Sequence, residues 1–167
     1  MKTAPQKQLL IGIGSPHGDD QIGWMIAEAI GAKGGTNITV RRASVPLDLL
    51  DWLKGADSLH IVDACVGSNA VGELTRWEWP ELVADHHDRT SFRSTHGFDL
   101  VSALRLGEKL GRLPSKVVIW GIEVGRVSQT IRPTEEIMHH LNAISDRIYQ
   151  ELTDARKVAG AILAKTG

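Results

Sequence analysis

The chain has 167 residues, a formal net charge of −1 and 42% hydrophobic residues, the composition of a globular protein that forms one domain over residues 1–167. Its 19 basic and 20 acidic residues argue against a nucleic-acid partner, which would require an excess of positive charge. The single cysteine excludes an intrachain disulfide, and no run approaches the roughly 18 apolar residues of a membrane span. We therefore expect a cytoplasmic protein without a membrane partner.

The first half of the chain alternates between strand and helix patterns. Residues 9–13 form a continuous apolar run that predicts a strand buried on both faces. A turn rich in glycine, proline and aspartate follows, and the apolar spacing then predicts an amphipathic helix that is stopped by Gly31, Gly34 and Gly35. Three further elements are a strand, a helix with proline in its first turn, and a buried strand, at residues 37–40, 46–53 and 59–64.

The second half adds two strands and two helices. Residues 73–79 alternate in polarity and predict an edge strand with one wet face, followed by a long polar connection, residues 80–95, that could be a lid or docking loop. A helix after His96, a buried strand at 117–122 and a long helix opened by Pro133 complete the chain. This alternation predicts a three-layer α/β/α sandwich with a mostly parallel central sheet of about five strands.

Three side chains that can bind a metal follow predicted strands or begin a helix. Asp20 lies in the turn after the first strand, Asp63 at the end of the third, and His96 at the start of a helix. In this fold class, chemistry collects at the carboxyl ends of the strands. Two carboxylates and an imidazole that meet there could hold one divalent ion and leave positions open to a substrate.

Each of these residues also has a structural interpretation. Asp19 or Asp20 could cap the following helix, and Asp63 could pair with a cation because an unpaired buried carboxylate is costly. His96 would lie in a first helical turn, where the dipole keeps an imidazole neutral. His17, His86 and His87 are weaker candidates, because neighbouring histidines point apart and no spaced partner is evident.

Two other sites compete with the metal hypothesis. The pattern of Gly12, Gly14 and Gly18 between a strand and a helix imitates a dinucleotide fingerprint, with Arg41 and Arg42 placed for a 2′-phosphate. Asp19 and Asp20 oppose it, because they put negative charge where a pyrophosphate would bind. A Cys65–His96 pair would make a thiol hydrolase, but buried free cysteines usually act as small apolar groups.

The chain resembles the hydrogenase maturation endopeptidases in the order and spacing of three segments. These are residues 12–23, Asp63 after Ile-Val, and His96 in Ser-Thr-His-Gly. The resemblance covers roughly residues 8–148. It implies an aspartyl-type peptidase that acts as a monomer on the large-subunit precursor of a [NiFe] hydrogenase and removes its C-terminal extension. The family's nickel-contacting positions match Asp20, Asp63 and His96, which would be the catalytic and metal residues.

The same resemblance suggests how nickel is used. Two aspartates and one histidine form a weak, open site, so we expect the protein to complete the coordination of nickel that the precursor brings. Two other functions remain open: a non-catalytic, metal-dependent docking or chaperone-like relative, and a stand-alone metal-dependent peptidase or hydrolase. Loss of mass at the precursor's C-terminus, and turnover of simple peptides, would distinguish them.

Overall fold

The computed structural model describes residues 6–35, 37–84, 100–126 and 129–164. Five strands form one sheet in the order β2-β1-β3-β5-β4, in which only β4 is antiparallel to its neighbour. The strands are β1 (Gln8–Ile13), β2 (Ile38–Ala43), β3 (Ser58–Cys65), β4 (Leu74–Glu78) and β5 (Lys116–Glu123). The predicted sheet of about five mostly parallel strands is confirmed.

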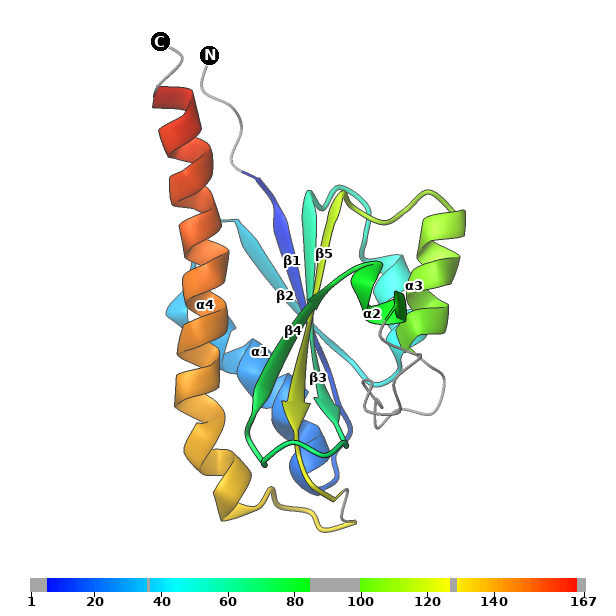
Figure 1. Cartoon of the computed structure of the whole chain (residues 1–167), viewed down its shortest axis with the longest axis vertical. Helices are drawn as coiled ribbons and strands as arrows, with labels where there is room; N and C mark the ends of the chain where they lie inside the picture. The colour runs from blue at the N-terminus through cyan, green and yellow to red at the C-terminus, as the bar shows by residue number, and fades with distance from the viewer. Residues whose placement is uncertain (1–5, 36, 85–99, 127–128, 165–167) are drawn as a thin grey trace.

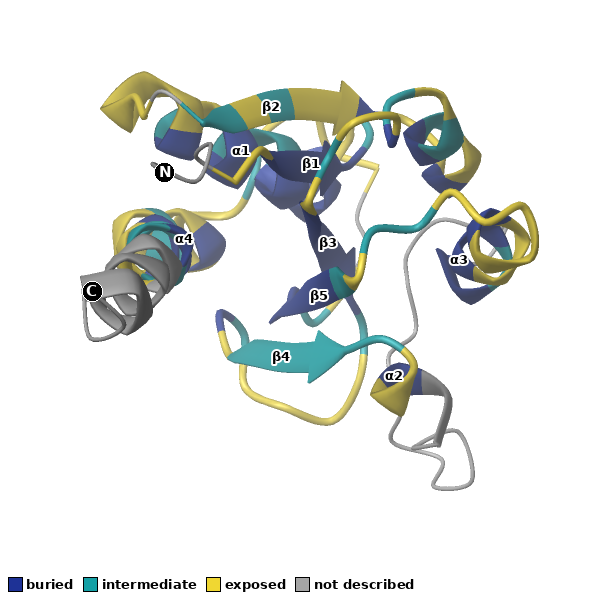
Figure 2. Cartoon of the chain, turned by 90° about the horizontal axis from the view of Figure 1, so that it is seen from above, coloured by how far each residue is buried: buried dark blue, intermediate teal, exposed yellow. Residues whose placement is uncertain are grey.

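Helical segments cover both faces of the sheet (Figure 1). One face carries α1 and α4, and the other carries η2, α2 and α3, so the molecule has three layers (Figure 2). The bounds are η1 (Gly18–Gln21), α1 (Ile22–Lys33), η2 (Pro46–Asp51), α2 (Glu81–Ala84), α3 (Leu100–Lys109) and α4 (Glu135–Ala164), where η marks a 3₁₀ helix. Over the described residues, no helix is long and apolar enough to cross a membrane.

The central strands are buried on both faces, as their continuous apolar runs predict. Along β1, Leu9, Ile11 and Ile13 pack toward α3, whereas Leu10 packs toward α1 and α4. This follows from the two-residue period of a strand, which sends alternate side chains to opposite faces. The two cores pack against opposite faces of β1 and β3 and hold these strands in position. The carboxyl ends of β1 and β3 carry the candidate site.

The edge strand β4 is anchored to the last helix by an ion pair. The Arg76 guanidinium donates to both carboxylate oxygens of Glu151 at 2.8–3.0 Å, and a further N–H reaches Glu78 at 2.7 Å. The prediction of an edge strand is confirmed, but no side of β4 is fully wet, because all five of its residues are half-buried. Leu74 packs against the second core and Trp77 against the first, so both faces of the strand have apolar neighbours.

Several predicted bounds differ from the structure. Residues 46–53 were expected to be an α-helix but form the short η2, whose length favours 3₁₀ over α geometry. Helix α1 continues past Gly31 to Lys33, and Gly34, one of the three glycines expected to stop it, follows with a φ of +73°. The second strand extends beyond residues 37–40 to Ala43, because β2 pairs with β1 along its whole length. The connection expected over residues 80–95 contains helix α2.

Candidate functional site

The strand order creates a crevice between the carboxyl ends of β1 and β3. From β1 the chain passes to β2 on one side, and from β2 it returns across β1 to β3 on the other side. In open α/β sheets such a switch point is where ligands bind. Asp20, in η1 after β1, and Asp63, in β3, both belong to this corner.

Two glycines allow η1 to lie directly against the sheet. A Cβ on Gly23 would overlap the carbonyl oxygen of Ile13 and would lie 2.8 Å from that of Val62. A Cβ on Gly12 would lie 2.7 Å from the carbonyl carbon of Gly23 and 2.8 Å from Cβ of Ala27. The first turn of α1 therefore rests on β1 and β3, and the preceding η1 contacts β3. This close approach brings Asp20 to the strand that carries Asp63.

Both carboxylates are buried. Asp20 is 3% exposed and Asp63 is fully buried, although the sequence placed Asp63 at the exit of its strand. Asp63 instead lies inside β3 in register with Gly121 of β5, two residues before the strand ends. The corner therefore contains buried carboxylate oxygens, and electrostatic interactions in such an environment are stronger than in bulk water.

Asp19 has a different role from its neighbour. Its Oδ1 accepts the backbone N–H of Thr134 at 2.6 Å, and its Oδ2 accepts the Thr134 hydroxyl at 3.0 Å. The same Thr134 Oγ1 accepts the N–H of Ile137 at 3.3 Å, in the first turn of α4. The expectation that Asp19 caps the helix that follows it is therefore wrong, because its carboxylate accepts hydrogen bonds at the start of α4.

The third predicted ligand, His96, lies outside the described residues, as do His86 and His87. Among the residues that the structure describes, no three His, Cys, Asp or Glu side chains are grouped as metal ligands. The three-ligand site of Asp20, Asp63 and His96 therefore stays a prediction. His17 is described: it is exposed and directly precedes η1.

Cys65 does not have the environment of a nucleophile. Burial raises the pKa of its thiol to about 12, and the nearby carboxylates of Glu123 and Asp63 add to this increase. A thiol with this pKa is protonated at neutral pH, whereas nucleophilic attack requires the thiolate. The thiol-hydrolase alternative is therefore disfavoured.

Glu123 is a further buried acid at this edge, besides Asp19, Asp20 and Asp63, and the sequence did not single it out. It ends β5 in register with Cys65 and is 3% exposed. Its Oε1 accepts the N–H of Gly67 at 2.6 Å, which holds the chain that leaves β3. The signal was available: an acidic residue directly follows the apolar run 117–122, just as Asp63 follows Ile-Val.

The remaining histidines of interest have structural environments. His60 is buried in the core, where its Nδ1 accepts the Trp120 indole N–H at 3.4 Å. Burial lowers the pKa of His60 to about 3, with further contributions from Lys116 and Arg76, so the ring is neutral. On α4, His139 is exposed, whereas His140 is half-buried because its ring packs over Gly72.

The dinucleotide alternative finds no support at this corner. The two aspartates of η1 are buried at the start of α1, where a pyrophosphate would have to bind. Arg42, one candidate for a 2′-phosphate, pairs with Glu28 and lies over the Trp24 ring, 4.2 Å from its centroid. Negative charge at the helix start therefore favours a cation over an anion.

Comparisons with known proteins agree with this architecture. The solved structure of the hydrogenase maturating endopeptidase HybD from E. coli is 22% identical, with a TM-score of 0.74 over 90% of this chain and 94% of that one. The [NiFe] hydrogenase maturation protease HybD from Thermococcus kodakarensis is 19% identical, with a TM-score of 0.69 over 88% and 99%. HycI from Thermococcus kodakarensis KOD1, also a [NiFe] hydrogenase maturation protease, is 22% identical, with a TM-score of 0.64 over 90% and 95%. At these identities the likeness shows a shared fold.

The family assignment comes from a sequence model. No curated protein matches the sequence. A family model described as hydrogenase maturation protease matches residues 43–151, which include Asp63 and His96 and begin after Asp20. This range is more than half of the chain. The chain therefore belongs to the hydrogenase maturation protease family, whose members hydrolyse peptide bonds.

Proposed function

We propose that this protein removes the C-terminal extension of a [NiFe] hydrogenase large-subunit precursor and recognises installed nickel through Asp20, Asp63 and His96. The observation that carries the proposal is the placement of two buried carboxylates at the corner where η1 contacts β3. Carboxylate and imidazole ligands suit a divalent ion, and three of them leave coordination positions for ligands from the precursor. Nickel is then part of the substrate, and the enzyme alone binds it weakly.

The residues of the corner have distinct tasks in this reaction. Nickel held in the precursor supplies positive charge near the scissile carbonyl. Asp20 and Asp63 bind and orient that centre, and a carboxylate of the same corner accepts the proton of the attacking water. Docking of the precursor sets the position of the peptide bond, which supplies much of the rate acceleration.

Exposed apolar side chains around this edge favour a protein substrate. Val45 and Leu47 follow β2, and Ile131 and Met138 follow β5, so all four lie in segments that leave the carboxyl ends of strands. Ile131 is 82% exposed, yet its carbonyl oxygen accepts the Gln21 side-chain N–H at 2.7 Å, next to Asp20 in the chain. These exposed apolar groups are available for contact with a protein substrate on either side of the corner.

Mass spectrometry of a nickel-loaded precursor tests the proposal. The wild-type protein should shorten the precursor at its C-terminus, and should leave the nickel-free precursor intact. Asp20→Asn, Asp63→Asn and His96→Ala should each slow cleavage about a hundredfold or more while the fold is retained. Asp146→Asn is the matched control, because Asp146 is an exposed acid on α4 that pairs only with Lys33 among the described residues.

Three outcomes would contradict the proposal. Normal cleavage by Asp20→Asn and Asp63→Asn would remove the two carboxylates from the site. Stable binding of the nickel-loaded precursor without any loss of mass would support a non-catalytic docking protein. Turnover of simple peptides with added divalent metal alone would support a stand-alone peptidase.

A further inference from the structure

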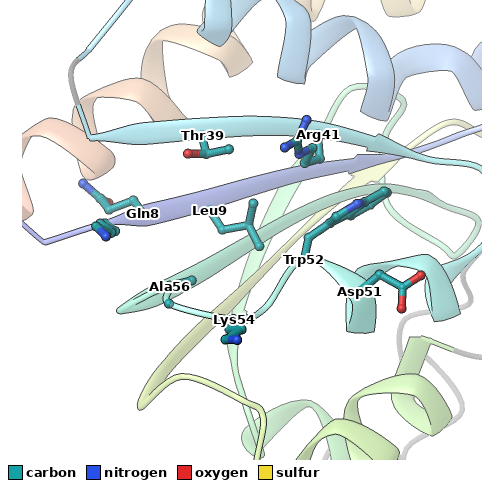
Figure 3. Close-up of a pocket in the computed structure, with 10 residues that line it drawn as sticks. Gln8, Leu9, Thr39, Arg41, Asp51, Trp52, Lys54 and Ala56 are labelled. Carbon is teal, nitrogen blue, oxygen red and sulfur yellow. The ribbon is translucent and has the colours of Figure 1, made fainter.

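Three adjoining hollows, which together we call the groove, lie at the edge of the sheet opposite the candidate site. Its first hollow, of about 350 Å³, lies at the amino end of β1 beside Trp52 (Figure 3). A second hollow of about 490 Å³ shares four lining residues with the first, Asp51, Lys54, Gly55 and Ala56. A third of about 310 Å³ shares Gly111, Leu113 and Pro114 with the second and reaches Trp79 and Pro80.

The groove is separate from the acidic corner. It is lined by the first residues of β1, by the chain that enters β3 and by the chain that enters β5, all at the amino ends of these strands. A strand rises about 3.3 Å per residue, so Ser58 and Asp63 lie roughly 17 Å apart along β3. A molecule bound in the groove would leave the carboxyl edge accessible.

The groove has an excess of positive charge. Its walls contain four cations and two acids: Lys7, Arg41, Lys54 and Arg112 against Asp51 and Glu108. Among the described residues, no ion pair engages these four cations. Because the whole chain has a net charge of −1, this local excess reflects the distribution of charge and not a basic composition.

The floor of the groove also offers apolar contacts. Thr39 and Arg41 of β2 lie opposite Leu9 and Ile11 of β1, so this part of the sheet faces η2. Thr39 and Arg41 are both exposed, because η2 does not extend over β2, the strand at this edge of the sheet. The half-buried Trp52 lies between them and the chain that enters β3 (Figure 3). Further along, Leu50, Leu53 and Leu113 line the second hollow.

We propose that this groove, lined by Lys7, Arg41, Lys54 and Arg112, binds an extended acidic segment of a partner protein, with apolar side chains of that segment seated against Trp52 and Leu113. Three hollows in series suit an extended chain better than a compact small molecule. The unpaired cations supply the charge complementarity that guides association and sets register. The site lies beyond the corner that carries the proposed cleavage, and binding there does not require Asp20 or Asp63.

The test measures peptide binding to the full-length protein by NMR chemical-shift titration. The probe is a capped peptide of about eight residues that alternates glutamate and leucine, and the control peptide carries lysine in place of glutamate. The acidic peptide should shift the backbone resonances of Gly55, Ala56 and Gly111, and its affinity should fall with added salt. Saturation by the lysine peptide with equal affinity would overturn the proposal.

Charge-reversal variants locate the binding. Arg41→Glu with Lys54→Glu should weaken the acidic peptide about tenfold or more, and Arg105→Glu with Arg147→Glu is the matched control, because both of these arginines are exposed and outside the groove. If the glutamate variant is poorly folded, Arg41→Gln with Lys54→Gln serves in its place. Equal binding by groove and control variants would overturn the assignment.

Two further probes separate other occupants from a peptide. Inorganic phosphate that saturates the same resonances with equal affinity would indicate a small-anion site. A single-stranded oligonucleotide that binds more tightly than the acidic peptide would indicate a nucleic-acid site. Either result would refute the peptide groove. Because no cleavage is measured, failure here leaves the Asp20 and Asp63 experiment unaffected.

Discussion

Replacement of Asp19 and of Asp20 should give opposite results, although the two residues are adjacent. Asp19→Ala removes the acceptor of two hydrogen bonds, from the N–H and the hydroxyl of Thr134. Hydrogen bonds to a charged group contribute about 1.5–3 kcal/mol each. Asp19 is 3% exposed, so water cannot readily take its place, but removal of a buried charge offsets part of the loss.

We therefore expect Asp19→Ala to lower the free energy of unfolding by about 3 kcal/mol. For a domain of this size that corresponds to a decrease in Tm of roughly 6–12 °C. Asp19→Asn keeps one acceptor and should lose about half as much. By contrast, Asp20→Asn keeps the size of the side chain and one acceptor oxygen, so it should lower the free energy of unfolding by less than Asp19→Ala does.

Urea denaturation followed by circular dichroism measures the stabilities, and mass spectrometry measures precursor cleavage under conditions where every variant is folded. Asp19→Ala should then cleave at close to the wild-type rate, whereas Asp20→Asn should not. The reasoning is refuted if Asp19→Ala unfolds like the wild type. It is equally refuted if folded Asp19→Ala fails to cleave while Asp20→Asn succeeds.

Three further predictions concern the core and the packing of the corner. Cys65→Ala should retain cleavage, and a thiol reagent should modify native Cys65 slowly at pH 8, because burial raises its pKa to about 12; rapid modification would contradict this. His60 has its pKa lowered from 6.5 to about 3, so the unfolded chain binds a proton that the native state excludes. The contribution of neutral His60 to stability is therefore complete above pH 6.5 and decreases as the pH falls toward 3. Between pH 7 and pH 5 the loss in the free energy of unfolding should be roughly 2 kcal/mol. Urea titrations at the two pH values should show that His60→Gln lacks this loss. Gly23→Ala should lower the free energy of unfolding by about 3 kcal/mol or more, because its Cβ would lie 2.8 Å from the Val62 carbonyl oxygen. Gly31→Ala, with its nearest contact at 3.4 Å, should be neutral or stabilising by up to about 1 kcal/mol. Equal unfolding curves for the two variants would show that the close approach at Gly23 is unimportant.

The architecture could be predicted because its signals are local. The apolar runs of β1, β3 and β5 indicate strands buried on both faces, and the alternation of polarity in β4 indicates an edge. Helix α4 is recognisable from the spacing of Ile137, Ile144 and Ile148. Boundaries were less accurate where pairing or packing decides them, as at β2 and η2.

The site could be predicted only in part. Asp20 and Asp63 were found because acidic residues are rare beside buried strands, and their common corner follows from the order of the strands. The different role of Asp19 could not be predicted, because its partner Thr134 lies 115 residues away in the chain. Glu123 could have been predicted from the sequence, because it follows the apolar run of its strand much as Asp63 does.

The bond between Asp19 and Thr134 has a consequence for the order of assembly. Asp20 is next to a residue that is held by the beginning of the last helix, and Gly18 also donates its N–H to Thr130. The acidic corner can therefore become fully ordered only after the C-terminal portion has been synthesised and has packed on the sheet. A nascent or truncated chain that ends before Thr134 would have the same acids in its sequence without the contact that holds η1 in place.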